Sequence, residues 1–76
     1  MFFVMPKLPV LTAKEVIRAL EKAGFSFVRQ KGSHRIFVKA SVGVTVPYHS
    51  GDLRKNTLHQ IIQQAGLTPE KFLELL

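Results

Sequence analysis

The chain has 76 residues, which is room for one small domain, because a chain of this length buries only about 60% of its unfolded surface. It contains no cysteine, which excludes disulfide frameworks, thiolate metal sites and cysteine nucleophiles and suits a reducing cytoplasm. Its hydrophobic content of 46% is too high for a disordered chain. We therefore expect one folded, cytoplasmic domain over residues 1–76, with residues 1–4 as a poorly ordered extension before Met5.

The formal charge of +6 is concentrated in one part of the chain. A basic zone is typical of a domain that binds a polyanion, with nucleic acid as the first candidate and an anionic membrane surface as the second. The alternative is a basic surface that only keeps the domain soluble. No stretch reaches the roughly 18 apolar residues of a membrane span, so we expect no membrane insertion. The residues that form this zone are Arg29, Lys31, Arg35, Lys39, Arg54 and Lys55, with one acid, Asp52, and all three histidines, His34, His49 and His59.

The first predicted helix spans residues 13–23. Thr12 and Glu15 have the spacing of a capping box, in which each side chain bonds the backbone N–H of the other residue. Gly24 follows as the residue that ends the helix. Apolar residues recur at helical spacing and form the face that we expect to be buried, which consists of Ala13, Val16, Ile17, Leu20 and Ala23.

Three strand-type segments follow, at residues 25–30, 34–39 and 44–48, and each gap between them has the length of a hairpin turn. A first turn at Lys31–Gly32 would place Arg29 opposite His34. A three-residue or bulged second turn separates the apolar side chains best. It predicts a core face of Phe25, Phe27, Ile36, Val38, Val44, Val46 and Tyr48, and an opposite face of Ser26, Val28, Arg35, Phe37, Lys39, Thr45 and His49.

The end of the chain predicts two further helices. Thr57 and Gln60 have the spacing of a second capping box, and Gly66 ends that helix. A short helix then begins at Thr68 with Pro69 in its first turn. The order helix, three strands, helix, short helix predicts the α+β class, with an antiparallel sheet covered by helices on one face.

Two segments carry a family resemblance. The run K-G-S-H-R-I-F at residues 31–37 and the run V-T-V-P-Y-H-S-G at residues 44–51 resemble the HicA family of toxin–antitoxin ribonucleases. The resemblance covers residues 5–76 and departs from the family at Asn56, where relatives often carry glycine, and in the four residues before Met5. Further matching residues are Gly24, Phe25, Thr57, Leu58, Ile61, Gln64, Ala65, Gly66 and Leu67.

The resemblance implies a fold like that of double-stranded-RNA-binding domains and cleavage of messenger RNA without a metal. It also implies that His34, the histidine of the G-S-H run, is the catalytic residue, and that a HicB antitoxin neutralises the protein. We therefore expect messenger RNA and a HicB-like protein as partners, and no cofactor.

The residue types around His34 suit the same chemistry. Cleavage through the 2′-hydroxyl needs a base, and an imidazole with an ordinary pKa of about 6.5 can take that proton. Cations must stabilise the negative charge on the phosphoryl oxygens, and Arg29, Lys31 and Arg35 suit this role. Gly32 lets a phosphate approach the turn closely, and the Ser33 hydroxyl can donate a hydrogen bond to it. The alternative is that Gly32 and Ser33 only form a hairpin turn and His34 only begins a strand. The predicted RNA-binding residues are Arg29, Lys31, Gly32, Ser33, Arg35, Lys39, Arg54 and Lys55.

His49 is the candidate for a second catalytic group. A two-residue turn at Ser41–Val42 would place it directly opposite His34, whereas the odd-length turn favoured above would place the two histidines on opposite faces. His49 could instead contact RNA or hold the following loop. The three histidines lack the close spacing of a zinc site, so we expect no metal. A non-catalytic RNA-binding module of the double-stranded-RNA type is the second hypothesis, and a domain that only binds an antitoxin is the third.

Overall fold

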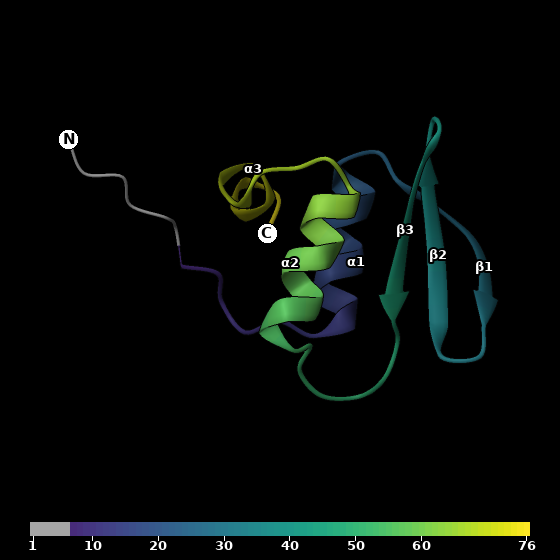
Figure 1. Ribbon diagram of the computed structural model, residues 1–76, viewed down its shortest axis with the longest axis horizontal. Coiled ribbons are helices and arrows are strands. Elements are labelled where there is room, and N and C mark those ends of the chain that lie inside the picture. Colours follow the sequence, from purple (N-terminus) through teal and green to yellow (C-terminus); the bar gives the residue numbers. More distant parts are fainter. Residues whose placement is uncertain (1–6) are drawn as a thin grey trace.

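The computed structural model describes residues 7–76, and its elements follow the predicted order (Figure 1). The strands form one antiparallel sheet with the second strand in the centre, and the helices all lie on one side of it. This arrangement confirms the α+β class and is consistent with a double-stranded-RNA-binding-domain-like fold. The expectation for residues 1–4 falls outside the described residues. The elements are α1 (Ala13–Lys22), β1 (Ser26–Lys31), β2 (His34–Lys39), β3 (Val42–Pro47), α2 (Lys55–Gln64) and α3 (Pro69–Glu74).

The hydrophobic core lies between the sheet and the helices. Both α1 and α2 contact β3, and α3 contacts α2 (Figure 1). None of the helices within residues 7–76 has the length and apolar character needed to cross a membrane. The most completely buried large side chains are Val16, Leu20, Phe37, Val44, Val46, Ile61 and Phe72.

Helix α1 begins with the predicted capping box. The backbone N–H of Thr12 donates to Oε1 of Glu15 at 3.0 Å, and the backbone N–H of Glu15 donates to the Thr12 hydroxyl at 3.3 Å. The helix ends one residue earlier than predicted, with Ala23 as its C-cap. Gly24 has a φ of +103°, a left-handed conformation that glycine adopts without steric cost, so the predicted stop is confirmed.

Both hairpin turns contain two residues, and both differ from the predicted turns. Lys31 pairs with His34, so the first turn is Gly32–Ser33, where Gly32 has a φ of +59°. Lys39 pairs with Val42, so the second turn is formed by residues 40 and 41. The predicted pairing of Arg29 with His34 is therefore wrong, because the turn lies one residue further along the chain.

The second turn reverses the predicted orientation of β2. An even-length turn places Phe37 beside Val44 and makes it almost fully buried, with 1% of its surface exposed. Because side chains alternate along a strand, Ile36 and Val38 then lie on the outer face, away from the helices. Phe27, which a β-bulge pairs with Phe37, is 53% exposed at the sheet edge. The prediction that Phe27, Ile36 and Val38 form the core face without Phe37 is wrong. The predicted core face is confirmed for its other members, Phe25, Val44, Val46 and Tyr48, which are buried or packed against the core.

Helix α2 begins two residues before the predicted capping box. Arg54 holds the N-cap position, and within the described chain its side chain makes no capping hydrogen bond. The cause is tertiary: Leu53 is buried and its backbone N–H donates to the carbonyl of Leu11 at 2.8 Å, which fixes the chain just before the helix. The later signals are confirmed, since Gly66 follows the helix with a φ of +72° and the Thr68 hydroxyl caps α3.

The capping box gives a pH dependence that can be tested. The backbone N–H of Thr12, and then its hydroxyl, lower the pKa of Glu15 below its ordinary value of 4.5. A carboxyl with a lowered pKa in the folded state stabilises the fold above its unfolded pKa, and this stability is lost as the pH falls through the folded value. We expect Glu15→Gln to have a smaller loss of Tm on acidification than the wild type, measured by circular dichroism. Identical losses would show that this carboxylate does not stabilise the fold.

The second hairpin turn contains a strained residue. Ala40 has a φ of +53°, and it is the one non-glycine residue with a positive φ within residues 7–76. Ala40→Gly removes the steric cost of that conformation, so we expect it to stabilise the protein by about 0.5–1 kcal/mol in urea unfolding. The matched control is Ser41→Gly, in the same turn, which should destabilise the protein instead. A loss of stability in Ala40→Gly would contradict the assigned turn.

Candidate RNA-cleavage site at the turn end of the sheet

His34 lies on the outer face of the sheet with two cationic side chains. It is the first residue of β2 and lies three residues from the buried Phe37, so alternation directs it away from the helices. Lys31 is its partner across the hairpin, and directly opposed residues of an antiparallel pair share a face. Arg29 pairs with Ile36 and therefore has the same orientation. We call His34, Lys31 and Arg29, all of which are exposed, the outer-face cluster.

Arg35 lies on the opposite face, towards the helices. Its guanidinium carbon is 3.5 Å from the ring centroid of Tyr48 and 5.9 Å from that of Phe27. Its Nε–H donates to Oε1 of Gln30 at 3.1 Å, and the Gln30 amide donates to the Gly32 carbonyl at 2.9 Å. These contacts link Arg35 to the turn that precedes His34. The structure therefore gives Arg35 a structural role and does not place it beside the outer-face cluster.

The end of β3 is attached to the same turn. The backbone N–H of Tyr48 donates to the carbonyl of Ser33 at 2.6 Å. Pro47, and not His49, is the residue opposite His34. Neither pairing considered from the sequence is therefore observed, since the even-length turn lies one residue earlier than Ser41–Val42.

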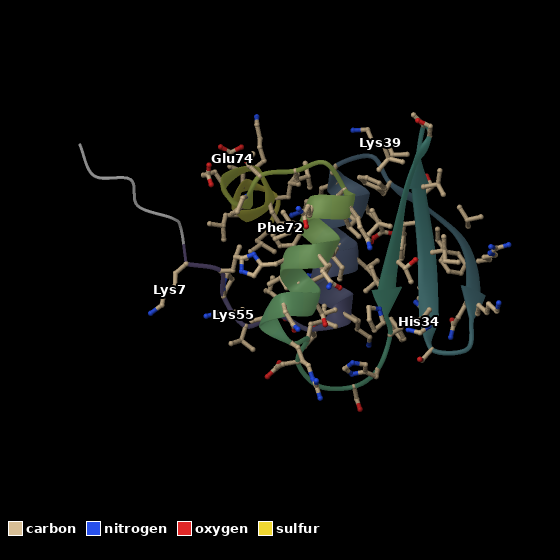
Figure 2. The ribbon with its side chains drawn as sticks, viewed as in Figure 1. Lys7, His34, Lys39, Lys55, Phe72 and Glu74 are labelled. Atoms are coloured by element: carbon tan, nitrogen blue, oxygen red, sulfur yellow. The ribbon has the colours of Figure 1, made fainter. Side chains whose placement is uncertain are left out.

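The remaining predicted RNA-binding cations lie elsewhere. Lys39 is at the other end of β2, five residues and roughly 17 Å from His34 at about 3.3 Å per residue, and its ammonium donates to the Ala23 carbonyl at 2.6 Å. Lys55, the first residue of α2, lines a small hollow together with Pro9 of the segment before α1. Figure 2 shows Lys39, Lys55 and His34 in three separate parts of the molecule. Arg54, next to Lys55, is the N-cap of α2.

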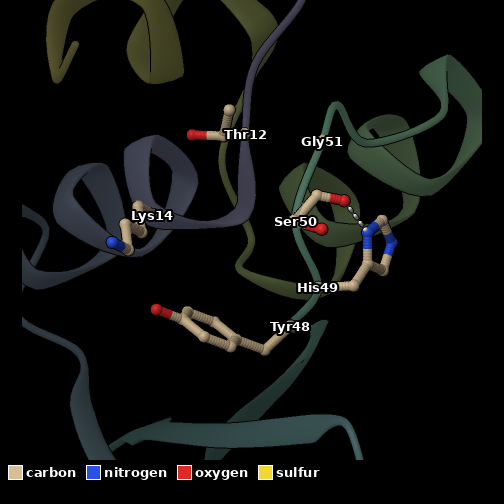
Figure 3. Close-up of a pocket in the computed structure, with 6 residues that line it drawn as sticks. All are labelled: Thr12, Lys14, Tyr48, His49, Ser50 and Gly51. Carbon is tan, nitrogen blue, oxygen red and sulfur yellow. Dashed lines mark hydrogen bonds between the residues drawn. The ribbon is translucent and has the colours of Figure 1, made fainter.

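A hollow of about 520 Å³ lies on the helix side of the same sheet end, between the start of α1 and the loop after β3 (Figure 3). The side chains of Tyr48 and Lys14 lie on one side of that loop, and the ring of His49 lies on the other side. Nδ1 of His49 is 2.9 Å from the Ser50 carbonyl, to which it donates a hydrogen bond. The residues that line the hollow are Thr12, Lys14, Tyr48, His49, Ser50 and Gly51.

The sequence analysis did not select Lys14 or Tyr48 as functional residues. Lys14 precedes the strands by more than ten residues and reads as a solvent-exposed position of an amphipathic helix. Tyr48 is adjacent to His49 in the V-P-Y-H run, and that proximity is the one available signal. Within residues 7–76, no group of three or more His, Cys, Asp or Glu side chains comes together to hold a metal ion.

Comparison with protein families decides the relationship. The family model described as HicA toxin of bacterial toxin–antitoxin matches residues 13–67, from the first residue of α1 to just beyond α2. The chain belongs to the HicA toxin family. No curated protein matches the chain. The HicA match includes the outer-face cluster and all the residues that line the hollow except Thr12. Membership of a toxin–antitoxin family implies an antitoxin partner.

The contacts of Arg35 predict its effect on stability in this HicA domain. Arg35→Lys loses the planar stack on Tyr48 and the bond to Gln30, so we expect a loss of about 1 kcal/mol in urea unfolding. Lys31→Gln, which removes a charge from the outer face, should change stability by no more than about 0.5 kcal/mol. Equal stability of the two variants would contradict the structural role of Arg35.

Proposed function

We propose that this HicA toxin is an endoribonuclease that cuts messenger RNA without a metal, with His34 as general acid or base. The observation that carries the proposal is the pairing of Lys31 with His34 at the exposed end of the hairpin. It brings a proton-transfer group and a phosphate-binding cation to one face, beside a glycine turn that a backbone can approach closely.

The outer-face cluster provides the parts of a cleavage reaction through the 2′-hydroxyl. His34 takes the proton from the 2′-hydroxyl while the 2′-oxygen attacks the adjacent phosphorus. The bond from phosphorus to the 5′-oxygen breaks, and that oxygen leaves with a proton from a general acid. Lys31 and Arg29 stabilise the negative charge on the phosphoryl oxygens. Gly32 and Ser33 shape the turn on which the phosphate lies.

His49 is the proposed assisting group. Because the Ser50 carbonyl can only accept a hydrogen bond, Nδ1 of His49 carries the proton of that bond and Nε2 is left for proton exchange. Its position beyond the end of β3, and not opposite His34, favours an accessory role in the supply of a proton. We therefore expect a smaller loss of rate in His49→Ala than in a His34 variant.

The antitoxin partner is proposed to be a HicB-like protein that covers the outer-face cluster. This face is cationic, so the complementary surface of the antitoxin should be acidic. Covering His34 and Lys31 would exclude RNA from both the base and the phosphate contacts.

A non-catalytic RNA-binding module is the second candidate, because the observed fold is consistent with that of double-stranded-RNA-binding domains. Such a module would bind through phosphates and 2′-hydroxyls and would leave the RNA intact. The two candidates differ in whether purified protein cuts RNA in the presence of a chelator.

The test is cleavage of single-stranded RNA by His34→Ala with EDTA present. General acid–base groups contribute about 10² to 10⁴ in rate, so we expect a loss of this size. His34 is exposed at a strand end, so Tm and RNA affinity should stay close to those of the wild type. His59→Ala, which removes an exposed histidine from α2, is the matched control and should cut normally. Cleavage at the wild-type rate by His34→Ala would refute the role of His34, and wild-type protein that binds RNA but never cuts it would favour the second candidate.

A further inference from the structure

We propose that the hollow beside Tyr48 binds one unpaired nucleotide of single-stranded RNA, with the base on the Tyr48 ring and a phosphate at Lys14. The inference rests on the proposed function in taking RNA as the ligand, but it concerns a site on the opposite face of the sheet from His34. Its volume of about 520 Å³ lies within the range of about 300–1,000 Å³ for pockets that enclose small ligands.

The hollow and the outer-face cluster are two sides of one sheet end. The Tyr48 N–H bonds the Ser33 carbonyl, so the aromatic residue of the hollow is fixed directly to the turn before His34. An RNA strand that passes around this end would contact both sites with neighbouring nucleotides. The hollow would then hold a nucleotide next to the bond that is cut.

Tyr48 is held in place before any ligand binds. The Arg35 guanidinium stacks at 3.5 Å from the ring centroid, and Arg35 is in turn held by Gln30. A ring held in this way loses little conformational freedom when a base stacks on the part of it that lines the hollow. Aromatic side chains accept every type of base in this way, so the site would show little preference for base identity.

Lys14 is the cationic side chain among the residues that line the hollow, and it is the group that would bind the phosphate. Lys14 is exposed, and its side chain lies on the same side of the loop as Tyr48 (Figure 3). Two acids lie near the hollow: Glu15 accepts hydrogen bonds from the backbone N–H and the hydroxyl of Thr12 through Oε1, and Asp52 follows Gly51 and pairs with Thr12 in an isolated β-bridge. A base can enter the hollow only when it is unpaired, so single-stranded RNA is favoured over a duplex.

The test measures the affinity of a short, fluorescent single-stranded RNA for variants that also carry His34→Ala, which prevents cleavage. Tyr48→Leu should weaken binding by about tenfold, while Tyr48→Phe, which keeps the aromatic ring, should stay within about twofold. Lys14→Gln should lower the slope of log affinity against log salt by about 0.7. Lys22→Gln makes the same change at the other end of α1 and is the matched control, with wild-type affinity at low salt.

Several outcomes would overturn the inference. Unchanged affinity in both Tyr48→Leu and Lys14→Gln would do so, and Lys14→Gln keeps the test valid even if Tyr48→Leu fails to fold. Resonances around residues 48–51 that shift with inorganic phosphate as much as with adenosine monophosphate would reduce the hollow to an anion site. Weaker antitoxin binding with unchanged RNA affinity would make it a protein interface. Because RNA cleavage by protein with an intact His34 is measured separately, loss of the hollow does not refute the proposed function, and failure of that function leaves the affinity test intact.

Discussion

The burial of Phe37 decides which way every side chain of β2 points. Its ring has 1% of its surface exposed and packs with Phe27 in an edge-to-face arrangement, at 5.8 Å between centroids. A β-strand has a period of two, so this one anchored position directs Arg35 towards the helices and His34 away from them. A one-residue change in register would reverse the two orientations and turn the imidazole towards the helices. The candidate site therefore depends on core packing three residues away.

The local signals of the sequence predicted local structure well. The Thr12–Glu15 capping box and the glycine that ends α1 involve residues within one turn, and both are present in the fold. The register of the sheet could not be predicted in this way, because it depends on which of several turn residues adopts a positive φ. Ala40 adopts a positive φ although alanine disfavours that conformation. The start of α2 could not be predicted locally either, because it is set by the hydrogen bond between the backbones of Leu53 and Leu11.

The site was predictable in part for the same reason. His34, Lys31 and Gly32 are adjacent in the sequence, so any hairpin brings them close together. The contacts of Arg35 and Lys39 could not be predicted, because each side chain meets a partner distant in the sequence, the Tyr48 ring for Arg35 and the Ala23 carbonyl for Lys39. Charge alone suggested one extended basic surface. The fold places Arg29 and Lys31 on the outer face beside His34, and it brings Arg35 and Lys39 into contact with Tyr48 and Ala23.

Photocrosslinking is the most direct test of whether RNA binds at the end of the sheet that carries the Gly32–Ser33 turn. Single-stranded RNA that contains thiouridine would be crosslinked to the His34→Ala protein, and the modified peptides identified by mass spectrometry. We predict adducts in residues 29–34 and 48–51, on the two sides of this end. Adducts confined to Lys39 or Lys55, with both of those segments unmodified, would contradict the account.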